Sequence, residues 1–272
     1  MQRLLGGAVL LWVAATAPAL AQGVVLELKP RAGDTLRMRL DQQTEISGAR
    51  PGGKPISVST TVVMHSRAIV LRGDGQFALI LAITDSMSVE SNDEHARALA
   101  EQARRGMEGQ QVRLRLAPDG SMALADDDRA VTRGVKDMVS IMPGSFPREP
   151  LAIGDTWMRE MPIPGSAQMN LPSGGRVRAR FRLDSVSRGG DFAYVSMRGA
   201  FQPASDSQRD DAAAGSVTGT LVVNRRRGWL SESRFVIQMR STVAMPSDGG
   251  RAPMRFRTRI TQVMRVLGDR EP

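Results

Sequence analysis

The sequence contains no cysteine, so its fold is not held by disulfides and it has no thiolate ligand for a metal. Histidine occurs only at His65 and His95, and lysine only at Lys29, Lys54 and Lys136. The motifs His-Glu-x-x-His, Gly-x-Ser-x-Gly and Ser-x-x-Lys, which serve zinc proteases and serine hydrolases, are absent from the chain. The sequence therefore predicts a protein that is not an enzyme and that carries no metal and no cofactor.

Long apolar runs are scarce, and the clearest one lies at the start of the chain. Arg3 precedes an apolar stretch over residues 4–17, and Ala19, Leu20 and Ala21 precede Gln22 in the small-residue pattern of a cleavage site. This pattern predicts a signal peptide over residues 1–21. The stretch is shorter than the ~20 apolar residues of a membrane-spanning helix. We therefore expect a periplasmic or extracellular protein with no transmembrane segment.

Positive charge exceeds negative charge, with a formal net charge of +9 at pH 7 that is carried mainly by arginine. Arginine alternates with apolar residues at 36–40, 112–116 and 177–183, and this period of two is typical of half-buried strands. The alternation predicts charged outer faces that oppose edge-to-edge pairing between chains. The alternative interpretation is that these arginines form a binding surface for anionic lipid headgroups or glycans. Because the arginines do not cluster in the sequence, we do not expect nucleic acid as a partner.

Further strands are predicted by β-branched or alternating apolar runs that glycine-rich turns separate. These runs are residues 24–28, 56–71, 76–89, 192–201, 216–223, 230–243 and 254–266. Long strands joined by short turns predict a mainly β fold, a curved antiparallel sheet or half-barrel.

Two segments have helical periodicity. The first begins at a Ser91 and Glu94 capping box and runs to Met107 with a weakly apolar face. The second follows three aspartates at 126–128 and places an apolar stripe over residues 131–142, which we expect to dock on the sheet. The aspartates lack the spacing of a calcium loop, so we interpret them as helix-capping residues.

Turn motifs recur in the same order along the chain. Gly33-Asp34-Thr35 returns as Gly154-Asp155-Thr156, and glycine turns near residues 73 and 120 return near 189 and 228. This order predicts an internal duplication, with one half over residues 22–143 and the other over 144–272, joined in one continuous sheet. Each Gly-Asp-Thr is interpreted as a tight turn followed by a strand start.

These motifs also carry a resemblance. Residues 26–30 leading into Gly33-Asp34-Thr35, and residues 147–151 leading into Gly154-Asp155-Thr156-Trp157, resemble a family of uncharacterised exported bacterial β-rich proteins over nearly the whole mature chain. The resemblance implies a β-rich fold and an envelope location, and it implies no activity. The expected architecture is also similar to the half-barrel lipid and lipoprotein carriers of the bacterial envelope, as an analogy of fold alone.

Methionine occurs 16 times, whereas aromatic residues make up 4% of the chain. Flexible thioethers adapt to irregular apolar ligands, although they also fill ordinary cores. We therefore expect a non-catalytic protein that binds an apolar or lipid-like ligand between the sheet and the second helix. The candidate ligand-binding residues are Phe77, Leu79, Met138, Met142 and Phe181. The alternative is a structural or protein-interaction module of the envelope, which has a dry core and a protein partner.

Overall fold

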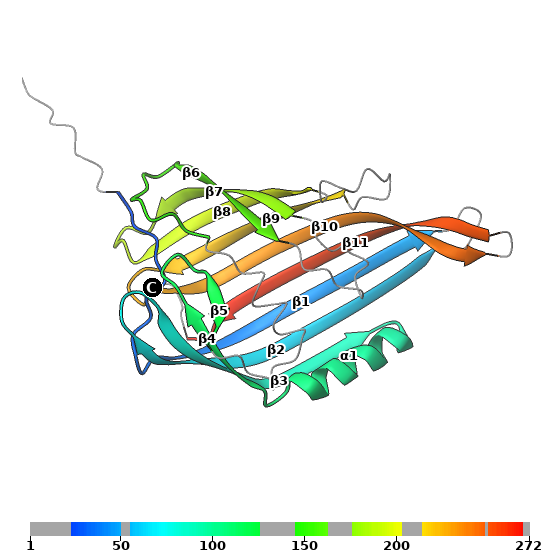
Figure 1. Ribbon diagram of the computed structural model, residues 1–272, viewed down its shortest axis with the longest axis horizontal. Coiled ribbons are helices and arrows are strands. Elements are labelled where there is room, and N and C mark those ends of the chain that lie inside the picture. The colour runs from blue at the N-terminus through cyan, green and yellow to red at the C-terminus, as the bar shows by residue number, and fades with distance from the viewer. Residues whose placement is uncertain are drawn as a thin grey trace, which may run out of the picture.

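A computed structural model of the chain describes residues 23–49, 55–125, 145–162, 176–202, 214–247 and 250–268. Figure 1 shows one large sheet of long strands with a single labelled helix beside it. The strands are β1 (Thr35–Ala49), β2 (Ile56–Gly73), β3 (Ala78–Ser91), β4 (Gln111–Leu116), β5 (Met122–Leu124), β6 (Thr156–Pro162), β7 (Arg176–Val186), β8 (Phe192–Gln202), β9 (Ala214–Asn224), β10 (Trp229–Ser247) and β11 (Gly250–Val266), and the helix is α1 (Glu94–Met107).

The sheet has 11 strands in the order β5-β4-β3-β2-β1-β11-β10-β9-β8-β7-β6. Every paired neighbour is antiparallel, and most pairs join strands that follow one another in the chain. The exception is the central pair of β1 and β11, which joins the two ends of the described chain over 12 residue pairs. The mainly β, antiparallel architecture that the sequence predicts is confirmed, and the sheet is open between β5 and β6.

The sheet has two chemically different faces, as the alternation of arginine with apolar residues predicts. We call the face that carries the buried core the inner face and the opposite one the outer face. On β7, for example, Val177, Phe181 and Leu183 are buried on the inner face, whereas Arg178 and Arg180 are exposed on the outer face. Residues from nearly every strand contribute to the inner-face core, which includes Leu36, Ala68, Val70, Ile80, Leu116, Trp157, Val195, Leu221 and Val223.

Two segments outside the strands complete the core at one end of the sheet. We call residues 23–30 and 145–151 the plug. Val24 and Leu151 exchange two backbone hydrogen bonds of 2.7 and 2.9 Å, and Leu26 and Phe146 are almost fully buried. The prediction of a strand over residues 24–28 is therefore wrong, because these residues pair with Leu151 and with the β4–β5 turn instead of joining the sheet.

Phe146 connects the plug to both edges of the sheet. Its backbone N–H donates to the Asp119 carbonyl in the β4–β5 turn at 3.0 Å, and its carbonyl accepts from Arg159 Nη2 of β6 at 2.9 Å. Nearby, Trp157 Nε1 donates to the Ser145 carbonyl at 2.6 Å. Because β5 and β6 are the two edge strands, these bonds hold the sheet in a curve around the plug.

Helix α1 covers the part of β3 that β4 does not reach. Glu108 Oε1, just after the helix, accepts the Met87 N–H at 2.9 Å, and the Thr84 N–H donates to the Gln110 carbonyl at 3.1 Å. Exposed strand edges invite pairing with other chains, so this cover protects the edge. Arg104 bonds both Glu108 and Glu101, and its hydrogen bond to Glu101 is the main cause that lowers the pKa of that carboxyl to about 2.

The N-cap of α1 differs from the predicted one. Asp93 caps the helix by accepting the Ala96 N–H at 2.7 Å, whereas the Ser91 hydroxyl lies 3.1 Å from Thr60 Oγ1 on β2. Ser91 is still the last residue of β3, so it pairs with β2 and cannot serve as the cap. The second predicted helix, over residues 129–142, lies outside the described residues.

The two Gly-Asp-Thr motifs form turns with the same hydrogen bonds. Gly33 has φ 89° and donates to Val70, while Gly154 has φ 97° and donates to Leu183. In each turn the Asp carboxylate accepts the backbone N–H three residues earlier, at 3.2 Å for Asp34 and 2.7 Å for Asp155. Strands β1 and β6 start directly after these turns. The internal duplication itself stays a prediction.

Replacing Phe146 by alanine is expected to lower the free energy of unfolding by about 3–5 kcal/mol, because a buried ring is lost where the two edges meet. Urea denaturation of the purified protein measures the change. Phe77→Ala, at a half-buried turn position, is the control and should cost less. Equal losses in the two variants would contradict the role of the plug.

Candidate functional site

A row of long apolar side chains crosses the inner face beyond the plug. The strand register places Met87 of β3 opposite Met64 of β2, Met64 opposite Leu40 of β1, and Leu40 opposite Met264 of β11. We call these four residues the methionine row. All four are half-buried, so their side chains remain partly accessible from the inner face.

The same row continues across the second half of the sheet with a different degree of burial. Met264 lies opposite Ser233 of β10, which lies opposite Leu221 of β9, and Val195 of β8 and Leu183 of β7 follow. Leu221, Val195 and Leu183 are at most 5% exposed. Within this row, the accessible apolar surface therefore lies on β1, β2, β3 and β11.

Methionine side chains are common at the inner-face positions of the strands. By strand register the inner-face positions include Met38, Met64, Met87, Met122, Met161, Met197, Met239, Met254 and Met264. Thioether side chains are flexible and polarisable, so a face rich in them can repack around ligands of different shapes.

Glycines on the inner face lie directly beneath aromatic rings of the next strand. A Cβ atom at Gly219 would collide with the Phe235 ring, one at Gly215 with Phe201, and one at Gly48 with the ring of its β11 neighbour. At Gly48 the absence of a side chain leaves room for this ring, and β1 continues to Ala49.

The predicted ligand-binding residues do not converge. Phe181 is 1% exposed and stacks on Trp157 with ring centroids 5.6 Å apart, so it belongs to the core. Leu79 occupies an outer-face position on β3, opposite Arg115. Phe77 lies in the β2–β3 turn beneath the guanidinium groups of Arg72 and Arg115, at 5.7 and 5.5 Å.

Met138 and Met142 lie outside the described residues, so the pocket that was expected between the sheet and their helix stays a prediction. The methionine row was not among the candidate residues, although each member lies in or beside an alternating run. Bringing the row together requires the pairing of β1 with β11, which no local pattern in the sequence reveals.

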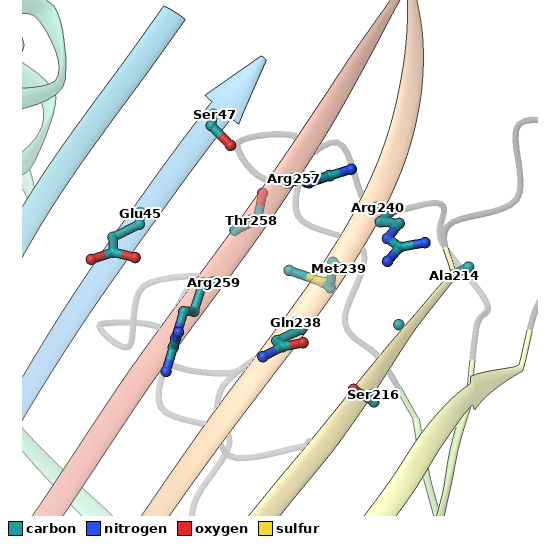
Figure 2. A pocket seen from close by; sticks show the side chains of 11 residues that line it. Glu45, Ser47, Ala214, Ser216, Gln238, Met239, Arg240, Arg257, Thr258 and Arg259 are labelled. Carbon is teal, nitrogen blue, oxygen red and sulfur yellow. The ribbon is translucent and has the colours of Figure 1, made fainter. Parts of the chain in front are cut away.

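A second feature lies on the outer face near the far ends of the long strands. A hollow of about 570 Å³ crosses β1, β11, β10 and β9. Figure 2 shows the side chains that line it. Its outer-face lining residues are Glu45, Ser47, Ala214, Ser216, Gln238, Arg240, Arg257 and Arg259. Gly215, Met239 and Thr258, which occupy inner-face positions by strand register, complete the lining. The polar members make this hollow chemically unlike the inner face.

Groups suited to catalysis are sparse in the described part of the chain. His65 Nδ1 lies 3.3 Å from Ser86 Oγ on the exposed outer face of β2 and β3. Within the described ranges, no three His, Asp or Glu side chains gather in a way that could hold a metal ion. Nor does any helix found there have the length and apolar character needed to cross a membrane.

No protein-family model matches the sequence, and no curated protein matches it either. Among solved structures, the fold is similar to that of lipovitellin, in a structure entitled "Lipid-protein interactions in lipovitellin", with a TM-score of 0.52 and 9% identity. That alignment covers 89% of this chain and 26% of the lipovitellin chain, so this chain spans about a quarter of its neighbour. The likeness shows an open β-sheet fold shared with a lipid-interacting protein.

Two other solved structures align over most of both chains with low TM-scores. DynF, from the dynemicin biosynthesis pathway of Micromonospora chersina, has a TM-score of 0.21 and 10% identity, with coverage of 94% of this chain and 92% of its own. An outer membrane channel from Pseudomonas putida F1 has a TM-score of 0.22 and 10% identity, with coverage of 92% and 99%.

Replacing Gly219 by alanine is expected to lower the free energy of unfolding by about 1–3 kcal/mol, because the added methyl group would force the Phe235 ring and the Arg234 carbonyl to move. Chemical denaturation measures the change. Gly189→Ala is the matched control, since a Cβ atom there meets no neighbour within 4 Å. A Gly219 variant as stable as the control would show that the ring does not rest on the glycine.

Proposed function

We propose that this protein is a non-catalytic, exported binding protein for an apolar or lipid-like molecule, and that the ligand lies against the methionine row. The observation that carries the proposal is the half-buried state of Met87, Met64, Leu40 and Met264 on the inner face of a sheet whose plug end is well packed.

Burial of apolar surface supports this assignment. The plug end supplies a dry core, in which Leu36, Val70 and Ile80 are at most 3% exposed. A few residues further along the same strands, large apolar side chains keep part of their surface accessible. Contiguous apolar surface is costly in water, so a protein that retains it commonly uses it to bind an apolar partner.

The composition of the row favours a flexible apolar ligand over a rigid polar one. Methionine offers polarisable surface without hydrogen-bond donors, and it adapts to acyl chains of different lengths. The fold likeness to lipovitellin agrees with a lipid-like ligand, since that structure's title concerns lipid-protein interactions. The likeness concerns the fold alone, so the proposal depends on the accessibility of the methionine row.

Export forms the second part of the proposal. Arg3, the apolar stretch over residues 4–17 and the Ala19-Leu20-Ala21 site are the features of a cleavable signal. A carrier in the periplasm or outside the cell would handle apolar molecules in an aqueous compartment, where a sheltered apolar face is useful.

Native mass spectrometry of the exported protein, purified without detergent, is expected to show a reproducible added mass that organic solvent extracts as a lipid. Met87→Gln should reduce the fraction of protein that carries this mass, because an amide placed in the row must give up its hydrogen bonds to water. Ser88→Gln is the matched control: it places the same side chain at the next position of β3, on the exposed outer face.

A bare protein mass that stays unchanged after incubation with lipid extracts would overturn the binding proposal and favour a structural or protein-interaction module. Equal ligand loss in the Met87 and Ser88 variants would place the ligand elsewhere than the row. Thermal denaturation of both variants confirms that each is folded.

Expression of the full chain in a bacterial host with a secretion pathway is expected to yield a periplasmic or secreted protein whose N-terminal residue is Gln22. N-terminal sequencing and intact-mass measurement of the fractionated protein provide the readout. Replacing Ala19 and Ala21 by arginine should block cleavage and leave residues 1–21 attached. Uncleaved wild-type protein in the cytoplasmic fraction would contradict export.

A further inference from the structure

The polar lining of the outer-face hollow forms a regular grid across four strands. One row contains Glu45, Arg259, Gln238 and Ser216, taken from β1, β11, β10 and β9 in turn. In the next row, Ser47, Arg257 and Arg240 are opposite one another on β1, β11 and β10. Because side chains two residues apart on a strand point the same way, both rows face the hollow.

Three guanidinium groups and one carboxylate therefore share this surface. In Figure 2 the Arg257 side chain reaches from β11 towards β10, where Arg240 lies, and Arg259 lies one row further along β11. All three arginines are exposed. In the described part of the chain no carboxylate forms a salt bridge with any of them.

Several other outer-face arginines have acidic partners. Arg39 bonds Asp41 at 2.7 Å, Arg67 bonds Asp85 at 2.8 Å, and Arg265 lies 3.4 Å from Glu232. Each of these partners comes from the same strand or the next one. The hollow lacks this internal neutralisation, although Glu45 lies directly opposite Arg259 in the strand register.

The direct opposition of Arg257 and Arg240 is itself unfavourable, since like charges at facing positions destabilise a sheet. A similar opposition occurs at Arg180 and Arg198 on β7 and β8, so repulsion alone does not define a site. The difference at Arg257 and Arg240 is a hollow lined by the hydrogen-bonding side chains of Ser47, Ser216 and Gln238.

We propose that this hollow binds a phosphate-class oxyanion, held mainly by Arg240 and Arg257. Guanidinium groups contact two oxygens of a phosphate at once, and two of them on adjacent strands can share one tetrahedral anion. Arg259, Gln238 and Ser47 supply further donors at the rim. Glu45 repels an anion from the β1 side of Arg259, so the site lies towards β10.

This site is independent of the proposed function. The methionine row lies on the inner face and the arginines lie on the outer face, so the sheet separates the two. The anion can be an inorganic or small soluble phosphate, or the phosphate of a lipid headgroup in a membrane. Both sources present the same chemistry to Arg240 and Arg257.

The test uses the exported protein with two probes at low ionic strength. Isothermal titration calorimetry follows inorganic phosphate, and co-sedimentation follows phosphatidylcholine vesicles with and without phosphatidic acid. The double variant Arg240→Gln/Arg257→Gln is expected to weaken phosphate binding at least tenfold. Arg240→Lys/Arg257→Lys keeps the charge without the two-pronged contact and should restore only part of the affinity.

The matched control is Arg180→Gln/Arg198→Gln, which removes another directly opposed arginine pair and the same net charge from the outer face. It should bind phosphate within twofold of wild type. Without ligand, Arg240→Gln/Arg257→Gln should be at least as thermally stable as wild type, because it relieves a like-charge contact. Phosphate should raise the melting temperature of the wild type and leave that of this variant unchanged.

Each outcome decides the proposal. The site is supported if Arg240→Gln/Arg257→Gln loses phosphate binding and Arg180→Gln/Arg198→Gln retains it. If Arg240→Gln/Arg257→Gln also no longer sediments with phosphatidic acid vesicles, the anion is identified as a lipid headgroup. Phosphate binding without vesicle binding identifies a soluble anion. The proposal is overturned if neither probe binds, or if both double variants lose binding equally, since binding would then follow net charge alone.

Discussion

Phe146 holds the two edges of an open sheet together, and the rest of the architecture depends on this connection. Its N–H bonds the β4–β5 turn, its carbonyl accepts from β6, and its ring is 2% exposed within the plug. A β-barrel closes by pairing its edge strands, but β5 and β6 do not pair. The two edges are instead linked at one end by side chains and a few hydrogen bonds to the backbone. The long strands beyond that end are consequently packed less completely on their inner face.

A single curved sheet then has two surfaces with separate chemistry. Along β11, Met264 and Ile260 are on the inner face, while Arg257, Arg259 and Arg265 are on the outer face. A shift of one residue in the pairing with β1 would exchange these sets and bury the arginines, so the register is strongly determined by the pattern. The proposed apolar ligand and the proposed anion would therefore use the same strands without competing for side chains.

Features that depend on neighbouring residues, such as strands and turns, can be predicted from the sequence, whereas contacts between distant strands cannot. Alternation locates most strands and shows that the arginines share a face, because both follow from a period of two. It does not identify which face is inner, so Leu79 and Phe181 were grouped although the sheet separates them. The β1–β11 pairing that brings Met264 to the methionine row joins strands far apart in the chain, so it could not be predicted. Arg240 and Arg257 face each other within the β10–β11 hairpin, but alternation alone does not give the register of that hairpin. Residues 24–28 have strand-like alternation because they bury Leu26 and Leu28 against the core, yet they form no ladder.

Strand β1 displays how stability and binding are distributed along the sheet. Leu36 is buried in the core beside the plug, and Leu40 lies in the methionine row. Ser47 borders the outer hollow, about 35 Å from Leu36 along an extended strand. The unfavourable features, half-exposed apolar side chains and opposed arginines, are found away from the plug. There they weaken the core least, and a well-packed end can offset their cost. This separation is expected of a scaffold whose binding surfaces are held in place by a stable region that takes no part in binding.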